Sequence, residues 1–275
     1  MTRPTILVVM DTVESAAACL RAAADASVAF ASPCIEVLHV RMDPAGTMLP
    51  EEVLTRRYSQ AIGARSAAEA APLRAAFDAW RADAHPADAT CPADATWIEI
   101  EAVPSAAISE RGSHAALVVL ARPSDATHPA SVAGFDAALF DTGKPVLVVP
   151  PGAGAPFGRH LAVGWRDVPA TRRCLAALRP WLMAAETVSV ISVTDGEAVL
   201  PEDWKAANLP PSATLHIVRP AGRSDGEALL QEAAALGADG LAVGAYRRGR
   251  LLERLLGGIT ADLLRAARTP VLMQA

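Results

Sequence analysis

Residues 237–273 read GADGLAVGAYRRGRLLERLLGGITADLLRAARTPVLM, and within them an apolar run is followed by a glycine, several arginines, a glycine pair and a helical pattern. The run 241–243 has the length and composition of a buried parallel strand, and it ends at Gly244, where the missing Cβ lets a ligand approach the backbone closely. Thr260 is a favourable N-cap for a helix over residues 261–268. A strand, a glycine-containing loop and a helix in this order predict an α/β fold.

Two interpretations of the loop stay open from these residues alone. Backbone N–H groups exposed by glycines and the positive end of a helix dipole together favour an anion such as a phosphate. Glycines are also ordinary turn residues between a strand and a helix, and arginines such as Arg250 are common on solvated surfaces.

The same stretch resembles the C-terminal signature of universal stress proteins. In that family a glycine, two residues, a second glycine, nine residues and then a glycine with serine or threonine wrap the phosphates of ATP. Gly244 matches the first position, and residues 248–256 supply the spacer before Gly257. The resemblance implies a Rossmann-like domain that binds ATP or a related adenine nucleotide, with Mg²⁺ as the accompanying metal.

Two positions depart from the family pattern. Arg247 stands where the second glycine belongs, and Gly258 stands where the hydroxyl residue belongs, although Thr260 falls where the family often has a threonine. An arginine adds charge for a phosphate, but its Cβ narrows the approach that a glycine would allow. The nucleotide-binding residues that the resemblance implies are Gly244, Arg247, Arg248, Gly257, Gly258, Ile259 and Thr260.

Composition limits the class of protein. The chain has 275 residues, enough for one large or two small domains, and its hydrophobic content of 52% with 20% charged residues is typical of a globular protein. A net charge of −5 argues against a general nucleic-acid binder. Apolar runs are too short for a membrane span or a signal peptide, so we expect a soluble cytoplasmic protein.

Strand and helix patterns alternate along the first half of the chain. Apolar runs predict strands at residues 5–10, 35–40, 96–103, 115–121 and 146–149. Helical patterns lie between them at residues 15–30, 50–84, 105–112 and 131–141, and a loop is predicted at residues 82–92. Such alternation predicts a parallel sheet with helices on both faces.

The pattern then restarts after a Pro- and Gly-rich linker at residues 150–156. Further strands are predicted at residues 161–165, 187–193, 213–218, 241–243 and 271–273, and a slide of 155 residues places Cys19 on Cys174. We therefore predict two tandem universal-stress-type domains, residues 1–150 and 158–275, each a five-stranded, mainly parallel sheet flanked by helices. In the family, single domains pair through their last strands. The resemblance thus implies that residues 146–149 and 271–273 meet as an intramolecular pseudo-dimer, with a homodimer of chains as a further option.

Each predicted domain retains a different part of the family's site. An acidic residue after the first strand helps hold the adenosine in the family; Asp11 stands there in the first domain, and Arg166 in the second. The first domain has Leu120 where the second has Gly244, so its phosphate loop is degenerate and we interpret it as a structural partner. Trp165 ends a strand beside the expected pocket, which makes it a candidate to contact a base.

No catalytic set is recognisable. Residues 222–226 match a G-x-S-x-G nucleophile motif, but no histidine follows Ser224, so we interpret Ser224 or Asp225 as the N-cap of a helix over residues 226–236. Gly143 and Lys144 lack the rest of a P-loop. Six histidines are scattered and four cysteines show no paired spacing, so we predict no metal site and reduced thiols. Slow ATP hydrolysis is the most activity that we expect.

Two functional hypotheses follow. The first is a cytoplasmic stress-response protein that binds an adenine nucleotide in its second domain and acts through its conformation or through protein partners. The second is an interaction protein that works without a nucleotide and retains relics of an ancestral site. The substitutions at Arg247 and Gly258 leave both hypotheses open.

Overall fold

The computed structural model describes residues 3–42, 56–83, 94–124, 127–154, 156–196, 207–244 and 259–275. The first half contains β1 (Thr5–Val9), α1 (Val13–Ser27), β2 (Cys34–Met42), α2 (Arg56–Asp83), β3 (Ala95–Ala102), α3 (Pro104–Gly112), β4 (Leu117–Ala121), α4 (Pro129–Phe140) and β5 (Val146–Val149). The second half contains β6 (His160–Gly164), α5 (Pro169–Ala184), β7 (Thr187–Val193), β8 (Thr214–Val218), α6 (Asp225–Ala235), β9 (Gly240–Gly244), α7 (Ile259–Ala266) and β10 (Val271–Gln274).

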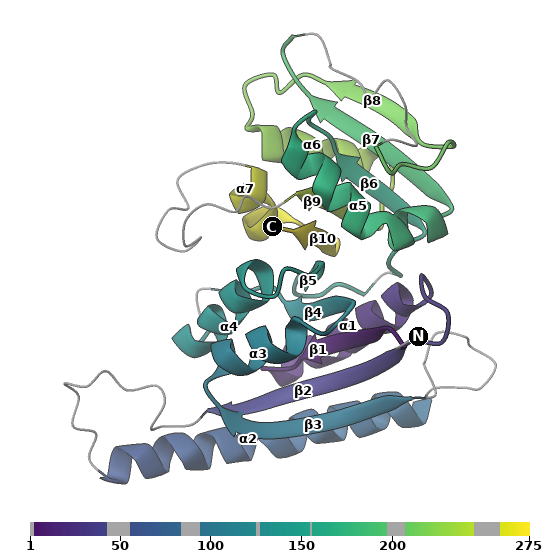
Figure 1. Cartoon of the computed structure of the whole chain (residues 1–275). Coiled ribbons are helices and arrows are strands. Elements are labelled where there is room, and N and C mark those ends of the chain that lie inside the picture. The colour runs from purple at the N-terminus through teal and green to yellow at the C-terminus, as the bar shows by residue number, and fades with distance from the viewer. Residues whose placement is uncertain are drawn as a thin grey trace.

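All these strands belong to one sheet, in the order β3-β2-β1-β4-β5-β10-β9-β6-β7-β8 (Figure 1). Neighbouring strands within each half are parallel, and the two halves repeat one strand order on either side of the β5–β10 pair. That pair is antiparallel, with Leu272 opposite Leu147. The α/β class and the meeting of the two last strands inside one chain are therefore confirmed.

The burial of the strands explains why their sequences are continuous apolar runs. β4 and β5 in the middle of the sheet are buried along almost their whole length, because helices cover both faces. The edge strands β3 and β8 contain several exposed residues between less exposed ones. No helix in the described part of the chain is long and apolar enough to cross a membrane.

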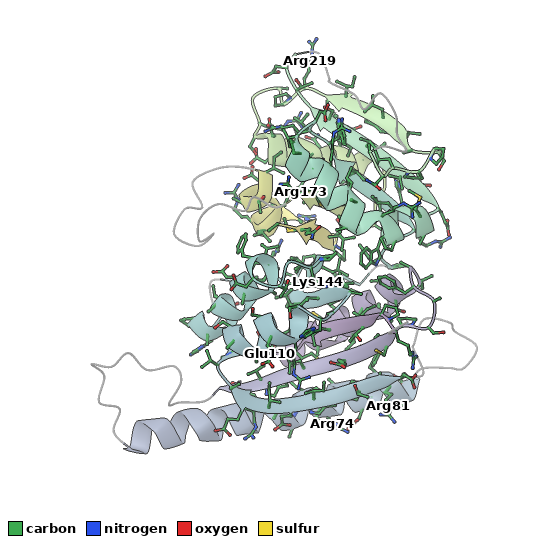
Figure 2. All side chains as sticks on the ribbon, viewed as in Figure 1. Arg74, Arg81, Glu110, Lys144, Arg173 and Arg219 are labelled. Atoms are coloured by element: carbon green, nitrogen blue, oxygen red, sulfur yellow. The ribbon has the colours of Figure 1, made fainter. Side chains whose placement is uncertain are left out.

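The core has two layers, and each layer runs through both halves. One layer lies under α1, α2 and α5 and joins Leu147 of β5 to Leu272 of β10. The other lies under α3, α4, α6 and α7 and joins Val148 to Met273. Helix α2 shows the usual division of faces, because Leu73 and Phe77 are fully buried whereas its charged side chains, labelled Arg74 and Arg81 in Figure 2, are exposed.

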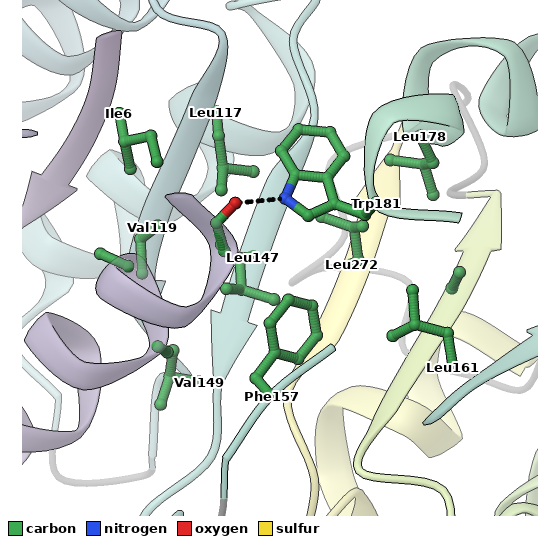
Figure 3. Close-up of a cluster of buried hydrophobic side chains, with 14 of the residues drawn as sticks. Ile6, Leu117, Val119, Leu147, Val149, Phe157, Leu161, Leu178, Trp181 and Leu272 are labelled. Atoms are coloured by element: carbon green, nitrogen blue, oxygen red, sulfur yellow. Dashed lines mark hydrogen bonds between the residues drawn. The ribbon is translucent and has the colours of Figure 1, made fainter. Parts of the chain in front are cut away.

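Trp181 of α5 connects the halves directly. Its Nε1 donates a hydrogen bond of 3.0 Å to the carbonyl oxygen of Ala26 in α1 (Figure 3). Its ring also meets that of Phe30 edge to face, with 5.1 Å between the ring centres. Phe157, from the segment that links the halves, packs into the same cluster (Figure 3).

The strand register corrects one expectation. Ala121 lies opposite Val149 in the first half, and Gly244 lies opposite Gln274 in the second. Because Val149 and Gln274 occupy the same place in β5 and β10, the counterpart of Gly244 is Ala121 and not Leu120. Of the predicted loop at residues 82–92, residues 82 and 83 belong to α2, and the remainder lies outside the described residues.

Candidate anion site at the carboxyl end of the second half

The second half offers the position where doubly wound sheets bind ligands. β6 has β7 on one side and β9 on the other, so the strand order reverses there. Ligands of such sheets lie outside the carboxyl ends of the strands at this reversal. β9 ends at Gly244, and α6 and α7 both begin at this edge because each follows a strand of the parallel set.

Four of the predicted site residues lie in the described structure. Gly244 is the last residue of β9, Ile259 and Thr260 are in the first turn of α7, and Trp165 directly follows β6. All four therefore lie at the carboxyl edge of the second half. The other predicted site residues, Arg247, Arg248, Gly257 and Gly258, lie outside the described residues.

Thr260 does not cap the helix as predicted. Helix α7 already includes Ile259, so Thr260 stands inside the first turn and not before it. Its side chain is 6% exposed, and its Oγ1 is buried with no hydrogen-bond partner among the described residues. A buried hydroxyl without a partner costs roughly 1–3 kcal/mol, so it is a natural contact point for a bound group.

Trp165 is turned into the core. Leu161, Val163 and Trp165 alternate onto the face beneath α5, and Trp165 is 4% exposed. The guanidinium carbon of Arg172 lies 5.8 Å from the centre of its ring. This burial argues against the base-stacking role that the sequence suggested, because Trp165 follows the alternation of its strand.

Asp262, which the sequence analysis did not single out, joins α7 to α6. The side chain is buried; Oδ2 accepts a 2.5 Å hydrogen bond from Ser224 Oγ, and Oδ1 accepts one of 2.5 Å from Arg265 Nη2. Gly226 makes this approach possible, since a Cβ at that position would collide with the Asp262 side chain. The signal in the sequence was a single acidic residue within an apolar helical pattern.

Ser224 is a helix cap, as predicted, and not a nucleophile. Its Oγ accepts a hydrogen bond from the Glu227 backbone N–H at 3.1 Å, and Glu227 Oε2 accepts one from the Ser224 N–H at 3.1 Å. This capping box fixes the start of α6. The Ser224 hydroxyl is fully used, because it also donates to Asp262.

Arg166 extends this network to the end of β6. Its Nη2 donates to Asp225 Oδ2 at 2.8 Å, and Asp225 is the first residue of α6. One arginine and two helix N-termini therefore meet at the carboxyl edge of the second half. No group of three or more histidine, cysteine, aspartate or glutamate residues in the described structure could hold a metal ion.

Comparison with known proteins identifies this half. Residues 170–274 match the model of the universal stress protein family. The second half is a universal stress protein domain.

The likeness in fold extends over the whole chain. A universal stress protein from Archaeoglobus fulgidus DSM 4304 superposes with a TM-score of 0.67 and 14% identity, covering 98% of this chain and 95% of that one. A protein of unknown function from Pseudomonas aeruginosa PAO1 gives 0.56 and 15% over 99% and 92% of the two chains. At these identities the comparisons establish the fold of both halves. Among curated proteins, none matched the sequence.

The first half has the fold of a universal stress protein domain but a different set of groups at its carboxyl edge. Burial raises the pKa of the Asp11 carboxyl, and Glu69 acts in the same direction, while a hydrogen bond from Ser131 and the nearby His39 favour its ionised form. Because Ser131 belongs to the first turns of α4, the Asp11 carboxyl lies near the N-terminus of that helix. The equivalent residue in the second half has the opposite charge.

Arg122, which directly follows β4, also has a structural partner. Its Nη1 donates to the carbonyl oxygen of Ala267 at 2.7 Å, just beyond the end of α7. A cation at that position complements the negative end of the helix dipole. The first half thus supports the helix whose other end contributes to the candidate site.

Proposed function

We propose that the second half binds an adenine nucleotide, ATP or a close relative, and that the chain is a cytoplasmic universal stress protein acting through its conformation or through protein partners. The observation that carries this proposal is the buried, unpartnered hydroxyl of Thr260 in the first turn of α7, the helix that follows Gly244 in the chain. A phosphate bound there would find a hydrogen-bond donor together with the positive end of a helix.

The proposed roles follow the chemistry of each residue. Gly244, Gly257 and Gly258 would let backbone N–H groups approach the phosphates, and Thr260 would donate its hydroxyl. Arg247 and Arg248 would add positive charge, and the backbone of Ile259 would contribute at the helix start. Mg²⁺ would accompany the nucleotide on its phosphates, with water as its other ligands.

We also propose that residues 1–150 and 158–275 are two domains and that the first is a structural partner. The repeated strand order supports the division. Asp11 beside α4 and Arg122 on α7 support the structural role, because both groups already have partners within the protein.

The second candidate is an interaction protein that works without a nucleotide. The Arg166–Asp225 ion pair favours it, since Arg166 stands where the family has the acidic residue that helps hold the adenosine and already has a partner within the protein. Under this hypothesis the glycines of the second half serve only as turn residues.

A matched pair of substitutions tests nucleotide binding. Gly244→Val adds a side chain at the end of β9, and Ala121→Val makes a similar addition at the corresponding register of β4. We expect calorimetric ATP titration to give micromolar binding for the wild type and Ala121→Val, and a loss of about tenfold or more for Gly244→Val at an unchanged melting temperature. Equal affinity in all three proteins would rule out the proposed site.

The state of the purified protein separates the two candidate functions. Denaturing extraction followed by mass spectrometry would identify any nucleotide carried through purification. If no nucleotide is released, no binding heat is detected and excess ATP leaves the melting temperature unchanged, the interaction-protein hypothesis is supported, because a ligand that binds the native state must stabilise it.

A further inference from the structure

Asp11 and Arg166 occupy the same structural position in the two halves. The Met10 N–H donates to the Leu38 carbonyl oxygen at 2.9 Å, and the Trp165 N–H donates to the Ile191 carbonyl oxygen at 2.8 Å. Both bonds run from the first residue after a central strand to its neighbouring strand. The next residue is therefore equivalent in the two halves, and its charge is reversed from negative to positive.

Arg166 is linked through α6 to α7, the helix of the proposed phosphate position. Its guanidinium contacts Asp225, the first residue of α6, and the preceding Ser224 donates to Asp262 in α7. Arg166 is therefore connected to α7 through Asp225 and Ser224, two adjacent residues at the start of α6. Arg166 stands on the side of β6, whereas Gly244 and Thr260 belong to β9 and α7.

The partner of Arg166 is exchangeable. The side chains of Arg166 and Asp225 are 51% and 39% exposed, and ion pairs at such exposure contribute little to stability. A phosphate offers more negative charge and a geometry that matches the guanidinium fork. A ligand phosphate could therefore take the place of Asp225 at little cost.

The sign of the charge at this position indicates which sugar group it accepts. In doubly wound sheets that bind dinucleotides, a carboxylate near the bound ribose hydrogen-bonds the 2′-hydroxyl, whereas an arginine nearby accommodates a 2′-phosphate, and the same chemistry applies to the two side chains compared here. We infer that the second half prefers nucleotides with a phosphate on a ribose ring hydroxyl, in addition to phosphate at the 5′ position. This inference rests on the proposed nucleotide site and specifies its ligand.

Two pairs of probes test the inference. ADP is compared with adenosine 3′,5′-bisphosphate and with adenosine 2′,5′-bisphosphate. All three carry two phosphates, but in the bisphosphates the second phosphate is attached to the ribose 3′- or 2′-hydroxyl. We expect calorimetry on the full chain to show at least one bisphosphate binding about tenfold or more tightly than ADP, as one charge-assisted contact implies. Arg166→Gln should abolish the preference, and Arg166→Asp, which installs the residue of the first half, should reverse it.

Arg159 provides the matched control. It lies just before β6, at the opposite edge of the sheet, and forms an exposed ion pair with Glu186 at 2.9 Å. Arg159→Gln removes the same charge at the opposite end of β6 and should leave the preference intact. If ADP binds as tightly as both bisphosphates, or if Arg166→Gln retains the preference, the inference is overturned while the nucleotide site stands. If neither ATP, ADP nor a bisphosphate binds the wild type, the nucleotide site fails and the inference fails with it.

Discussion

Thr260 carries a hydroxyl into the interior of the protein without a partner for it among the described residues. Nearly all buried polar groups in native proteins have a hydrogen-bond partner, so an exception at the expected end of a sheet is a mark of a binding position. A bound ligand that accepts a hydrogen bond from the Thr260 hydroxyl would offset the free-energy cost of leaving this hydroxyl unpaired.

Substitution of Thr260 by valine separates stability from binding. Thr260→Val keeps the shape and removes the unpaired hydroxyl, so we expect the free energy of unfolding of the empty protein to rise by about 1 kcal/mol and nucleotide affinity to fall. Urea denaturation and calorimetry would measure the two effects.

Thr142 is the appropriate control, because it is equally buried at 6% exposure but its hydroxyl is satisfied. It donates to the Ala138 carbonyl oxygen at 2.7 Å and accepts from the Lys144 N–H at 3.2 Å. Thr142→Val should lower the free energy of unfolding by about 1–2 kcal/mol without affecting binding. Two variants that shift stability in the same direction would contradict our view of Thr260.

Among the elements, α7 is held at both ends by side chains from elsewhere. Near its start, Asp262 receives the Ser224 hydroxyl from the cap of α6. Just after its end, the Ala267 carbonyl oxygen accepts from Arg122 of the first half. A short helix of 8 residues has little stability of its own, so these contacts and its buried face determine its position.

Gly226 tests the contact between α6 and α7. In an exposed helix position, replacing glycine by alanine gains up to about 1 kcal/mol. At position 226 the added methyl group would meet Asp262, so we expect Gly226→Ala to lower the free energy of unfolding by about 1–3 kcal/mol in urea denaturation. An increase in stability would show that the two helices can separate without cost.

At the scale of the whole molecule, the two core layers make one folding unit of both halves. Each layer contains residues of β5 and β10 and continues beneath helices of both halves. Trp181 adds a hydrogen bond and a ring contact across the junction. We therefore expect a single cooperative unfolding transition for the chain.

Two buried thiols report on the halves separately. Burial raises the pKa of Cys19 in α1 and of Cys174 in α5 to about 12, so neither should react with iodoacetamide at pH 8 in the native protein. Pulse alkylation in urea, followed by peptide mass spectrometry, should label both thiols at one midpoint. Cys34 is partly exposed and serves as the positive control.

Removal of the junction contact should uncouple the two midpoints. Trp181→Ala deletes a large buried side chain and should lower the free energy of unfolding by about 3–5 kcal/mol. Because the loss falls at the contact between halves, we expect Cys19 and Cys174 to become reactive at different urea concentrations. A shared midpoint in the variant would show that the β5–β10 pair alone is sufficient for cooperativity.

Most of the fold follows from local pattern. Apolar runs and helical periodicity predicted the alternating strands and helices, because parallel strands covered on both faces must be apolar along their length. The N-cap at Ser224 was predictable for the same reason, since a capping box is contained within four consecutive residues. The prediction that Leu120 is the counterpart of Gly244 was wrong by one residue, because a comparison of the halves without gaps ignores small changes in loop length.

The sequence by itself determined the fold class and the repeat, because these depend on periodicity, and the resemblance to a family implied the meeting of the last strands. Only the tertiary structure decided which polar groups are satisfied. Trp165 turned inward, Thr260 was left without a partner, and Arg166 paired with Asp225 from another element. Such outcomes depend on contacts between residues far apart in the chain, and side-chain direction at those contacts is set by packing and not by local sequence.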